Sequence, residues 1–209
     1  MKRSRKSTAT ILVAALALSA LSLASRASYV LDPCQSESSC FFGTVVLCPA
    51  GDGDPLSGAA TIYVTVRDFG GTPIYLIPAA DFWVTGCNGG LNLCFGSGSS
   101  NADADTDTNG QTTISGAVRA GGCDNSLAVV VQGQILVDWP ACSNYECHSI
   151  EVRSPDVNGD LVVDIIDFAT WGPYYQAAAF PPCYDFTWDG VIDIVDFSIF
   201  GQHFLHTCS

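Results

Sequence analysis

The sequence predicts a chain of two folded parts, an all-β sandwich over residues 28–154 followed by a small α-helical module over residues 155–209. Three observations predict this arrangement. Short β-branched segments separated by turn-forming residues fill the first part, an acid-rich segment near the end of the chain occurs twice, and a basic, then apolar, stretch precedes both parts.

The first 27 residues have the layout of a secretory signal peptide. A basic start is followed by an apolar run, Ile11–Leu23, and by small residues that suggest cleavage after Ala27. The alternative is a membrane anchor, but this run is shorter than the roughly 20 residues that span a bilayer. We therefore expect a secreted or cell-surface protein with no membrane span in its mature chain.

The composition excludes two classes of protein. With 48% hydrophobic and 14% charged residues, the 209-residue chain is too apolar to be an intrinsically disordered tail. After residue 27 it carries 21 acidic side chains against Arg67, Arg119 and Arg153 alone, so binding to the phosphates of nucleic acid is not expected.

The cysteines agree with export. All ten follow the predicted signal peptide, and an even number suits a disulfide framework in an oxidising compartment. A zinc site is the weaker alternative, because no pair has CxxC spacing. Proximity in sequence suggests three of the bridges: Cys87 with Cys94, Cys142 with Cys147, and Cys183 with Cys208.

Seven short segments predict the strands of the sandwich. They are Phe41–Leu47, Thr61–Arg67, Asp81–Thr85, Thr112–Val118, Leu127–Gln132, Ile135–Asp138 and Ser149–Arg153. Ile62, Val64 and Val66 alternate with polar neighbours, as in a strand with one buried face.

The spacing of Asp105, Asp107 and Asn109 resembles the first half of a calcium loop. Gly116 stands where a closing carboxylate is needed, so a polar turn at Asn109-Gly110 is favoured.

Two segments of this part resemble bacterial immunoglobulin-like domains of the invasin and adhesin type. They are Thr65-Val66-Arg67-Asp68 leading to Pro73-Ile74, and Thr106-Asp107-Thr108-Asn109-Gly110-Gln111. The resemblance implies an immunoglobulin-like spacer or display module without catalytic residues.

The repeat near the C-terminus predicts two calcium sites. Residues 156–172 recur at residues 185–201, with eight of the seventeen positions identical. Ca²⁺ prefers six to eight oxygen ligands, which a twelve-residue loop offers at positions 1, 3, 5, 7, 9 and 12. In the first loop these are Asp156, Asn158, Asp160, the Val162 carbonyl, Asp164 and Asp167; in the second they are Asp185, Thr187, Asp189, the Val191 carbonyl, Asp193 and Asp196.

Each loop leads into a predicted amphipathic helix, Asp164–Trp171 and Asp193–Leu205. We expect the apolar residues at position 8, Val163 and Ile192, to face one another. The simpler alternative is that the aspartates only solvate and cap these helices. This explains the acidic character of the segment but not the repeated spacing of its aspartates.

Residues 155–208 resemble a type I dockerin domain, which pairs two calcium-binding loop–helix units of the EF-hand kind. The resemblance implies two Ca²⁺ ions and a cohesin-type partner module, in a polysaccharide-degrading or cell-surface assembly. Loop positions 10 and 11, which read the partner in that family, fall on Ile165 and Ile166 and on Ile194 and Val195. The near-equivalence of the two pairs suggests two binding modes related by a half turn.

Two departures from the family's loop are expected to weaken the sites. Leu161 stands at position 6, where glycine is usual, and Thr187 offers a neutral hydroxyl at position 3.

No catalytic motif is evident, so a non-catalytic protein is expected. The alternatives are an adhesin in which calcium is only structural and a polysaccharide-binding protein, with Trp83, Trp139 and Tyr145 as sugar-stacking candidates.

Overall fold

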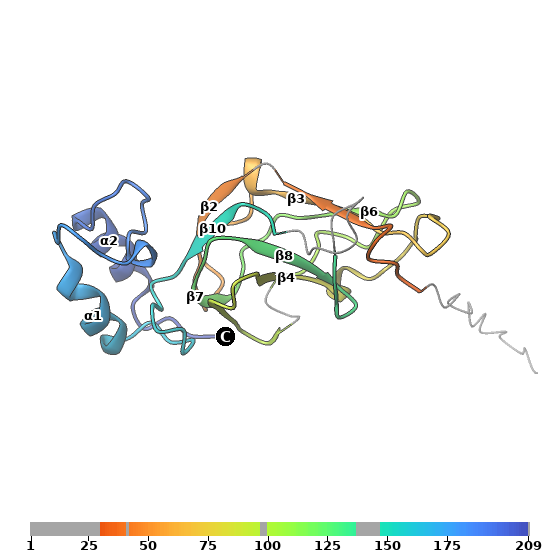
Figure 1. The fold of residues 1–209 in the computed structure, drawn as a ribbon. Helices are drawn as coiled ribbons and strands as arrows, with labels where there is room; N and C mark the ends of the chain where they lie inside the picture. Colours follow the sequence, from red (N-terminus) through yellow and green to blue (C-terminus); the bar gives the residue numbers. More distant parts are fainter. Residues whose placement is uncertain (1–29, 41, 97–99, 137–146, 209) are drawn as a thin grey trace, which may run out of the picture.

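The computed structural model describes residues 30–40, 42–96, 100–136 and 147–208. The predicted signal peptide, Trp139, Cys142 and Tyr145 lie outside these ranges. The described part of the chain is mostly β-sheet, with two helices gathered at one end (Figure 1).

The strands form three sheets (Figure 1). The first sheet contains, in spatial order, β1 (Glu37–Ser39), β3 (Ile62–Thr65) and β6 (Gln111–Ile114). The second contains β2 (Gly43–Val46), β10 (Ile150–Arg153), β7 (Ala120–Asp124) and β5 (Leu91–Leu93). The third contains β4 (Phe82–Gly86), β8 (Leu127–Val131) and β9 (Gln134–Ile135). All neighbours pair antiparallel except β2 and β10, which run parallel.

Residues from all three sheets enclose one hydrophobic core. Ile62, Val64 and Val66 are fully or almost fully buried in it, while Tyr63 between them is 52% exposed. The predicted alternation therefore holds at residues 62–64, whereas Thr65, which was expected on the exposed face, is 8% exposed and buried. β8 is buried along its whole length, because β4 and β9 pair with its two edges and the core covers it.

Six of the seven predicted strands are present in the described residues, as β2, β3, β4, β6, β8 and β10. The seventh, Ile135–Asp138, overlaps β9 only at Ile135, and its residues 137 and 138 lie outside the described ranges. The prediction missed β1, β5 and β7. β7 has the sequence Ala-Gly-Gly-Cys-Asp, which lacks the branched side chains that mark a strand, and its place in the sheet comes from pairing with β5 and β10.

The three predicted disulfides are wrong. The structure joins Cys87 to Cys147, Cys94 to Cys208 and Cys123 to Cys183, with sequence separations of 60, 114 and 60 residues. Short separation was a poor guide, because strand pairing brings distant segments together. Disulfides of this kind are compatible with an extracellular protein.

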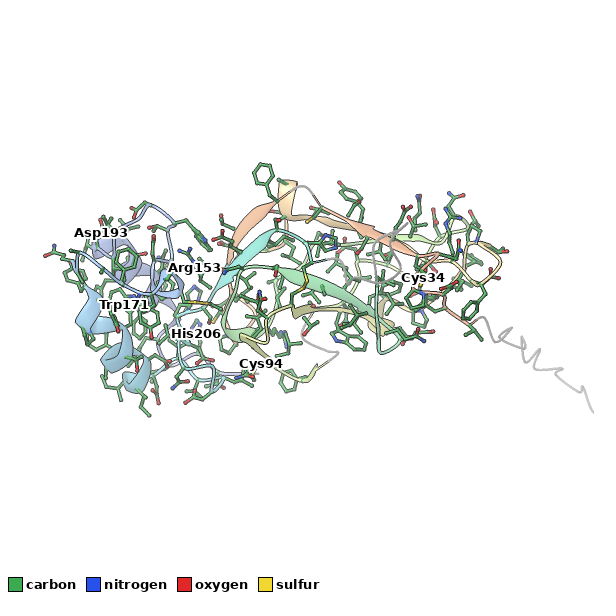
Figure 2. All side chains as sticks on the ribbon, in the orientation of Figure 1. Cys34, Cys94, Arg153, Trp171, Asp193 and His206 are labelled. Carbon is green, nitrogen blue, oxygen red and sulfur yellow. A yellow bond between two sulfur atoms is a disulfide. The ribbon has the colours of Figure 1, made fainter. Side chains whose placement is uncertain are left out.

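The C-terminal part contains the helices α1 (Ile165–Trp171) and α2 (Ile194–His203). Each begins with a capping box, in which the side chain of Asp164 or Asp193 accepts a hydrogen bond from the first turn and Asp167 or Asp196 bonds back to the N-cap amide. A second hydrophobic core lies between the helices and contains Val46, Val163, Trp171, Phe186, Ile192 and Phe200. Trp171 is 1% exposed and lies among these side chains (Figure 2).

The two parts are joined firmly. The disulfides Cys94–Cys208 and Cys123–Cys183 both cross from the β part to the C-terminal part, and Val46 of β2 contributes to the second core. The backbone amide of Gly122 in β7 also donates to the carbonyl of Asp156 at 2.8 Å. Neither helix of the described residues has the length and apolar character that crossing a membrane requires.

Candidate metal centres

The first acidic loop, loop 1 (residues 156–167), brings three carboxylates together. One oxygen from each of Asp156, Asp160 and Asp167 lies within 4.8 Å of the others. Asp156 and Asp167 are fully buried, and Asp160 faces solvent. Buried carboxylates that face one another are unfavourable unless a proton or a cation neutralises them, and three converging carboxylate oxygens suit a divalent ion.

Backbone amides hold these carboxylates in place. Asp156 accepts hydrogen bonds from the amides of Gly159, Asp160 and Leu161 at 2.7–3.1 Å. Asp167 accepts from the amides of Asn158 and Asp164 at 3.1 and 2.8 Å. The loop therefore folds around its own first and twelfth residues.

The backbone of strand β7 packs directly against the side chain of Asp156. A Cβ atom added at Gly121 would collide with the carboxylate of Asp156. Glycine at this position thus leaves the space that Asp156, the first residue of loop 1, occupies. This gives a role to part of the glycine-rich strand that the sequence did not predict.

The pKa values of the buried carboxyls reflect this crowding. Burial, reinforced by the charges of Asp167 and Asp160, raises the pKa of Asp156 to about 6. Burial also raises the pKa of Asp167, and the charges of Asp160 and Asp164 act in the same direction. Without a bound cation, loop 1 therefore holds its protons more tightly than ordinary aspartates do.

Leu161 adopts the left-handed conformation that position 6 of the loop requires. Its φ is 73°, and Gly159 at position 4 has the same value. In the second loop the two residue types exchange places, with Trp188 at position 4 (φ 59°) and Gly190 at position 6 (φ 87°). Both loops therefore make the same turns, and each has one non-glycine residue in a conformation that costs about 1–2 kcal/mol.

The second loop, loop 2 (residues 185–196), is closed in the same way. Asp196 is fully buried and accepts from the amides of Phe186, Thr187 and Asp193 at 2.7, 3.1 and 2.9 Å. The hydroxyl of Thr187 lies 3.1 Å from an oxygen of Asp185 and 3.4 Å from one of Asp196, toward both of which it donates. Burial raises the pKa of Asp196 as well.

Loop 2 differs in having a cation of the chain beside it. Arg153, at the end of β10, donates to the carbonyl of Asp185 and lies 3.8 Å from its carboxylate. The guanidinium also stacks over the ring of Trp188, with its central carbon 4.4 Å from the ring centroid. Arg153 is 8% exposed and lies at the junction with the β part (Figure 2). It offsets part of the negative charge that would attract a metal to loop 2.

The remaining predicted ligands lie at the loop surfaces. Asp160 and Asp189 accept from the amides of Val162 and Val191, and Asn158 donates to Asp160. The two residues at position 9, Asp164 and Asp193, are the helix N-caps. Capping thus accounts for positions 9 and 12, but it gives no reason for Asp156 and Asp160 to converge on Asp167.

Val163 and Ile192, at position 8, are both fully buried in the second core. Both side chains belong to the same core, but within the described residues their backbone groups form hydrogen bonds with other segments and not with each other. Val163 bonds instead to Leu205 and His206, and the carbonyl of Ile192 accepts from Gln176. The segment after α2, which the repeat does not include, is therefore what pairs with loop 1.

The predicted partner residues lie on the surface of the helices. Ile165 and Ile194 are 63% and 62% exposed, and Ile166 and Val195 are 55% and 49% exposed. Equivalent positions in the two repeats therefore have nearly equal exposure.

The acidic stretch near residue 105 is arranged as a turn. The carboxylate of Asp107 accepts from the amides of Asn109 and Gln111, Asp105 accepts from Ala79, and Asp103 accepts from Thr113 and Ser115. Each of these acids serves a local hydrogen bond, in line with the favoured alternative.

Comparison with known proteins adds little. No protein-family profile matches the chain, and neither does any curated protein. Among solved structures, the crystal structure of the Lin-41 filamin domain is similar at 16% identity and a TM-score of 0.30, covering 57% of this chain and 95% of that one. At that TM-score the likeness carries no argument, and the all-β description depends on the sheets described above.

Proposed function

We propose that residues 155–208 form a dockerin-like module that binds two Ca²⁺ ions and docks onto a cohesin-type partner. The preceding part, on this proposal, is an immunoglobulin-like display module of a secreted, non-catalytic protein in a polysaccharide-degrading or cell-surface assembly. The convergence of Asp156, Asp160 and Asp167 within a loop that occurs twice is the observation that carries the proposal.

Bound calcium would neutralise the buried carboxylates and hold both loops in the conformation that starts the helices. The Asp167 and Asp196 carboxylates connect calcium binding to the start of each helix, because each accepts hydrogen bonds from amides of its loop and from the N-cap amide of its helix. Calcium would thereby keep α1 and α2 in position.

The exposed side chains on those helices support a protein partner. Ile165, Ile166, Ile194 and Val195 are each about half or more exposed, and together with Phe168 and Phe197 they leave apolar surface uncovered. The partner surface should accordingly be apolar at its centre.

A calcium-dependent pull-down with a type I cohesin module tests the proposal. Binding should occur in Ca²⁺ and disappear in chelator. Changing Ile165 and Ile166 to Gln, or Ile194 and Val195 to Gln, should leave binding largely intact if either repeat can face the partner, whereas the quadruple variant should lose it.

Phe69→Gln is the matched control, because Phe69 is 68% exposed on the β part and far in sequence from the repeats. Calcium uptake without any cohesin binding would support an adhesin in which calcium is structural. Retention on insoluble polysaccharide, undisturbed by the quadruple variant, would favour the carbohydrate-binding alternative.

A further inference from the structure

A cluster of four metal-binding side chains lies where the β part meets the end of α2. Cys48 and Asp52 follow strand β2, His203 is the last residue of α2, and His206 lies three residues beyond it. One ligand atom from each of the four lies within 4.8 Å of the others. We propose that these residues form a structural Zn²⁺ site, separate from the two acidic loops.

The distances suit a tetrahedral ion. The Nδ1 atom of His206 lies 3.5 Å from Cys48 Sγ and 3.2 Å from Asp52 Oδ2, and the Nδ1 atom of His203 lies 3.5 Å from Asp52 Oδ1. Ligand atoms bonded at 2.0–2.3 Å to a tetrahedral zinc ion are about 3.3–3.7 Å from one another. The other pairs of ligand atoms lie within 4.8 Å, so closing around the metal needs side-chain movements of about 1 Å or less.

His203 provides independent support. The residue is 9% exposed, and its buried Nδ1 has no hydrogen-bond partner within the described part of the chain. A buried ring nitrogen without a partner is costly, and a metal ion would satisfy it. Both histidines direct Nδ1 toward Asp52, so the unsatisfied atom lies in the cluster itself.

The chemistry of the donors selects zinc over calcium. Thiolate and imidazole are ligands that Zn²⁺ prefers, whereas Ca²⁺ takes oxygen ligands almost exclusively. Four protein ligands fill a tetrahedral shell and leave no position open for substrate, which is typical of a structural site.

A reactive, metal-free thiol explains the position of Cys48 less well than a metal ligand does. Cys48 is fully buried, so external reagents do not reach its sulfur. A buried structural thiol of this kind is chemically inert. Cys48 also lies outside the disulfides formed in the described residues.

The position of the site defines its role. Cys48 and His206 are 158 residues apart in sequence, and the ion would join them beside the Cys94–Cys208 disulfide (Figure 2). Zinc would therefore fasten the end of α2 to the β part and fix the orientation of the helical face relative to the sheets.

Metal titration of the full, disulfide-bonded chain tests the site. One Zn²⁺ per chain should bind and resist excess Ca²⁺. Co²⁺ in its place should give the visible bands of a tetrahedral site together with a thiolate-to-cobalt charge-transfer band. Cys48→Ser should abolish that band, and His203→Ala should weaken zinc binding at least tenfold.

Two further variants keep the result interpretable. Asp52→Asn keeps the size of a half-exposed side chain and removes its charge, and it should weaken zinc binding without altering the circular dichroism spectrum. Asp167→Ala should lose calcium and keep zinc, which separates this site from the proposed function. Absence of bound zinc, or zinc binding and a cobalt spectrum unchanged by Cys48→Ser, would overturn the proposal.

Discussion

Loop 1 and loop 2 carry aspartates at the same four positions, yet their surroundings differ. In loop 1 the carboxylates of Asp156, Asp160 and Asp167 face one another above strand β7. In loop 2 the Arg153 guanidinium lies against Asp185, and a neutral threonine takes position 3. Sequence identity between repeats thus does not ensure equal metal affinity, because the neighbouring β part supplies different groups to each. We expect loop 1 to bind Ca²⁺ more tightly.

Removing the closing carboxylate should give the largest effect. Asp167→Ala deletes a buried, proposed ligand of loop 1 and should lower its calcium affinity by two orders of magnitude or more, about 3 kcal/mol. Asp196→Ala should do the same for loop 2 and leave the tighter site intact. Calorimetric titration of the full chain measures both, and two sites still titrating in either variant would show that the ligand assignment is wrong.

Arg153→Met should reverse part of the difference between the loops. The change keeps an apolar stem over Trp188 but removes the charge 3.8 Å from the Asp185 carboxylate. In an Asp167→Ala background, where loop 2 alone binds, calcium affinity should rise about tenfold, which is about 1.4 kcal/mol. Unchanged or weaker binding would mean that Arg153 supports the loop rather than competing with the metal.

Gly121→Ala should affect loop 1 alone. A methyl group there collides with the Asp156 carboxylate and should lower the affinity of loop 1 by roughly tenfold, or about 1.4 kcal/mol. Gly116→Ala is the matched control, since a Cβ at Gly116 meets no atom within 4 Å. Equal calcium binding in both variants would argue against β7 as the support of this ligand.

Lowering the pH should stabilise the metal-free C-terminal part. Burial raises the pKa of Asp156 from its usual 3.8 to about 6, so between these values the folded chain binds more protons than the unfolded one. In chelator, that stability is present below pH 4 and is lost as the pH rises through 6. Unfolding of the helical signal at pH 5 should occur about 2–4 °C higher than at pH 7.5. Asp156→Asn should remove most of this dependence, and an unchanged pH profile in that variant would contradict the assignment to Asp156.

Leu161→Gly should give the smallest effect. It relieves the positive φ at position 6 of loop 1, but the flexibility of glycine in the unfolded chain offsets part of the gain, which leaves about 0.5 kcal/mol of stabilisation. Trp188→Gly makes the equivalent backbone change in loop 2 and also removes the ring beneath Arg153, so it should be destabilising instead. Thermal unfolding of the two variants distinguishes backbone strain from packing.

Much of the candidate site followed from local sequence. The capping boxes of α1 and α2 involve residues three apart, and the strands that were predicted carry branched side chains in alternation, so nearby residues suffice to specify them. The disulfides did not follow, because sheet pairing decides which distant cysteines meet.

The sequence by itself determined the duplicated loops, their helices and the candidate acidic ligands, because these depend on spacing within about a dozen residues. Tertiary structure alone decided what surrounds them. Arg153, Gly121 and the cluster of Cys48 with His206 act across sequence separations that no local pattern encodes. The physical reason is that charge, burial and metal coordination act through space, so their effect is set by which segments the fold packs against each other.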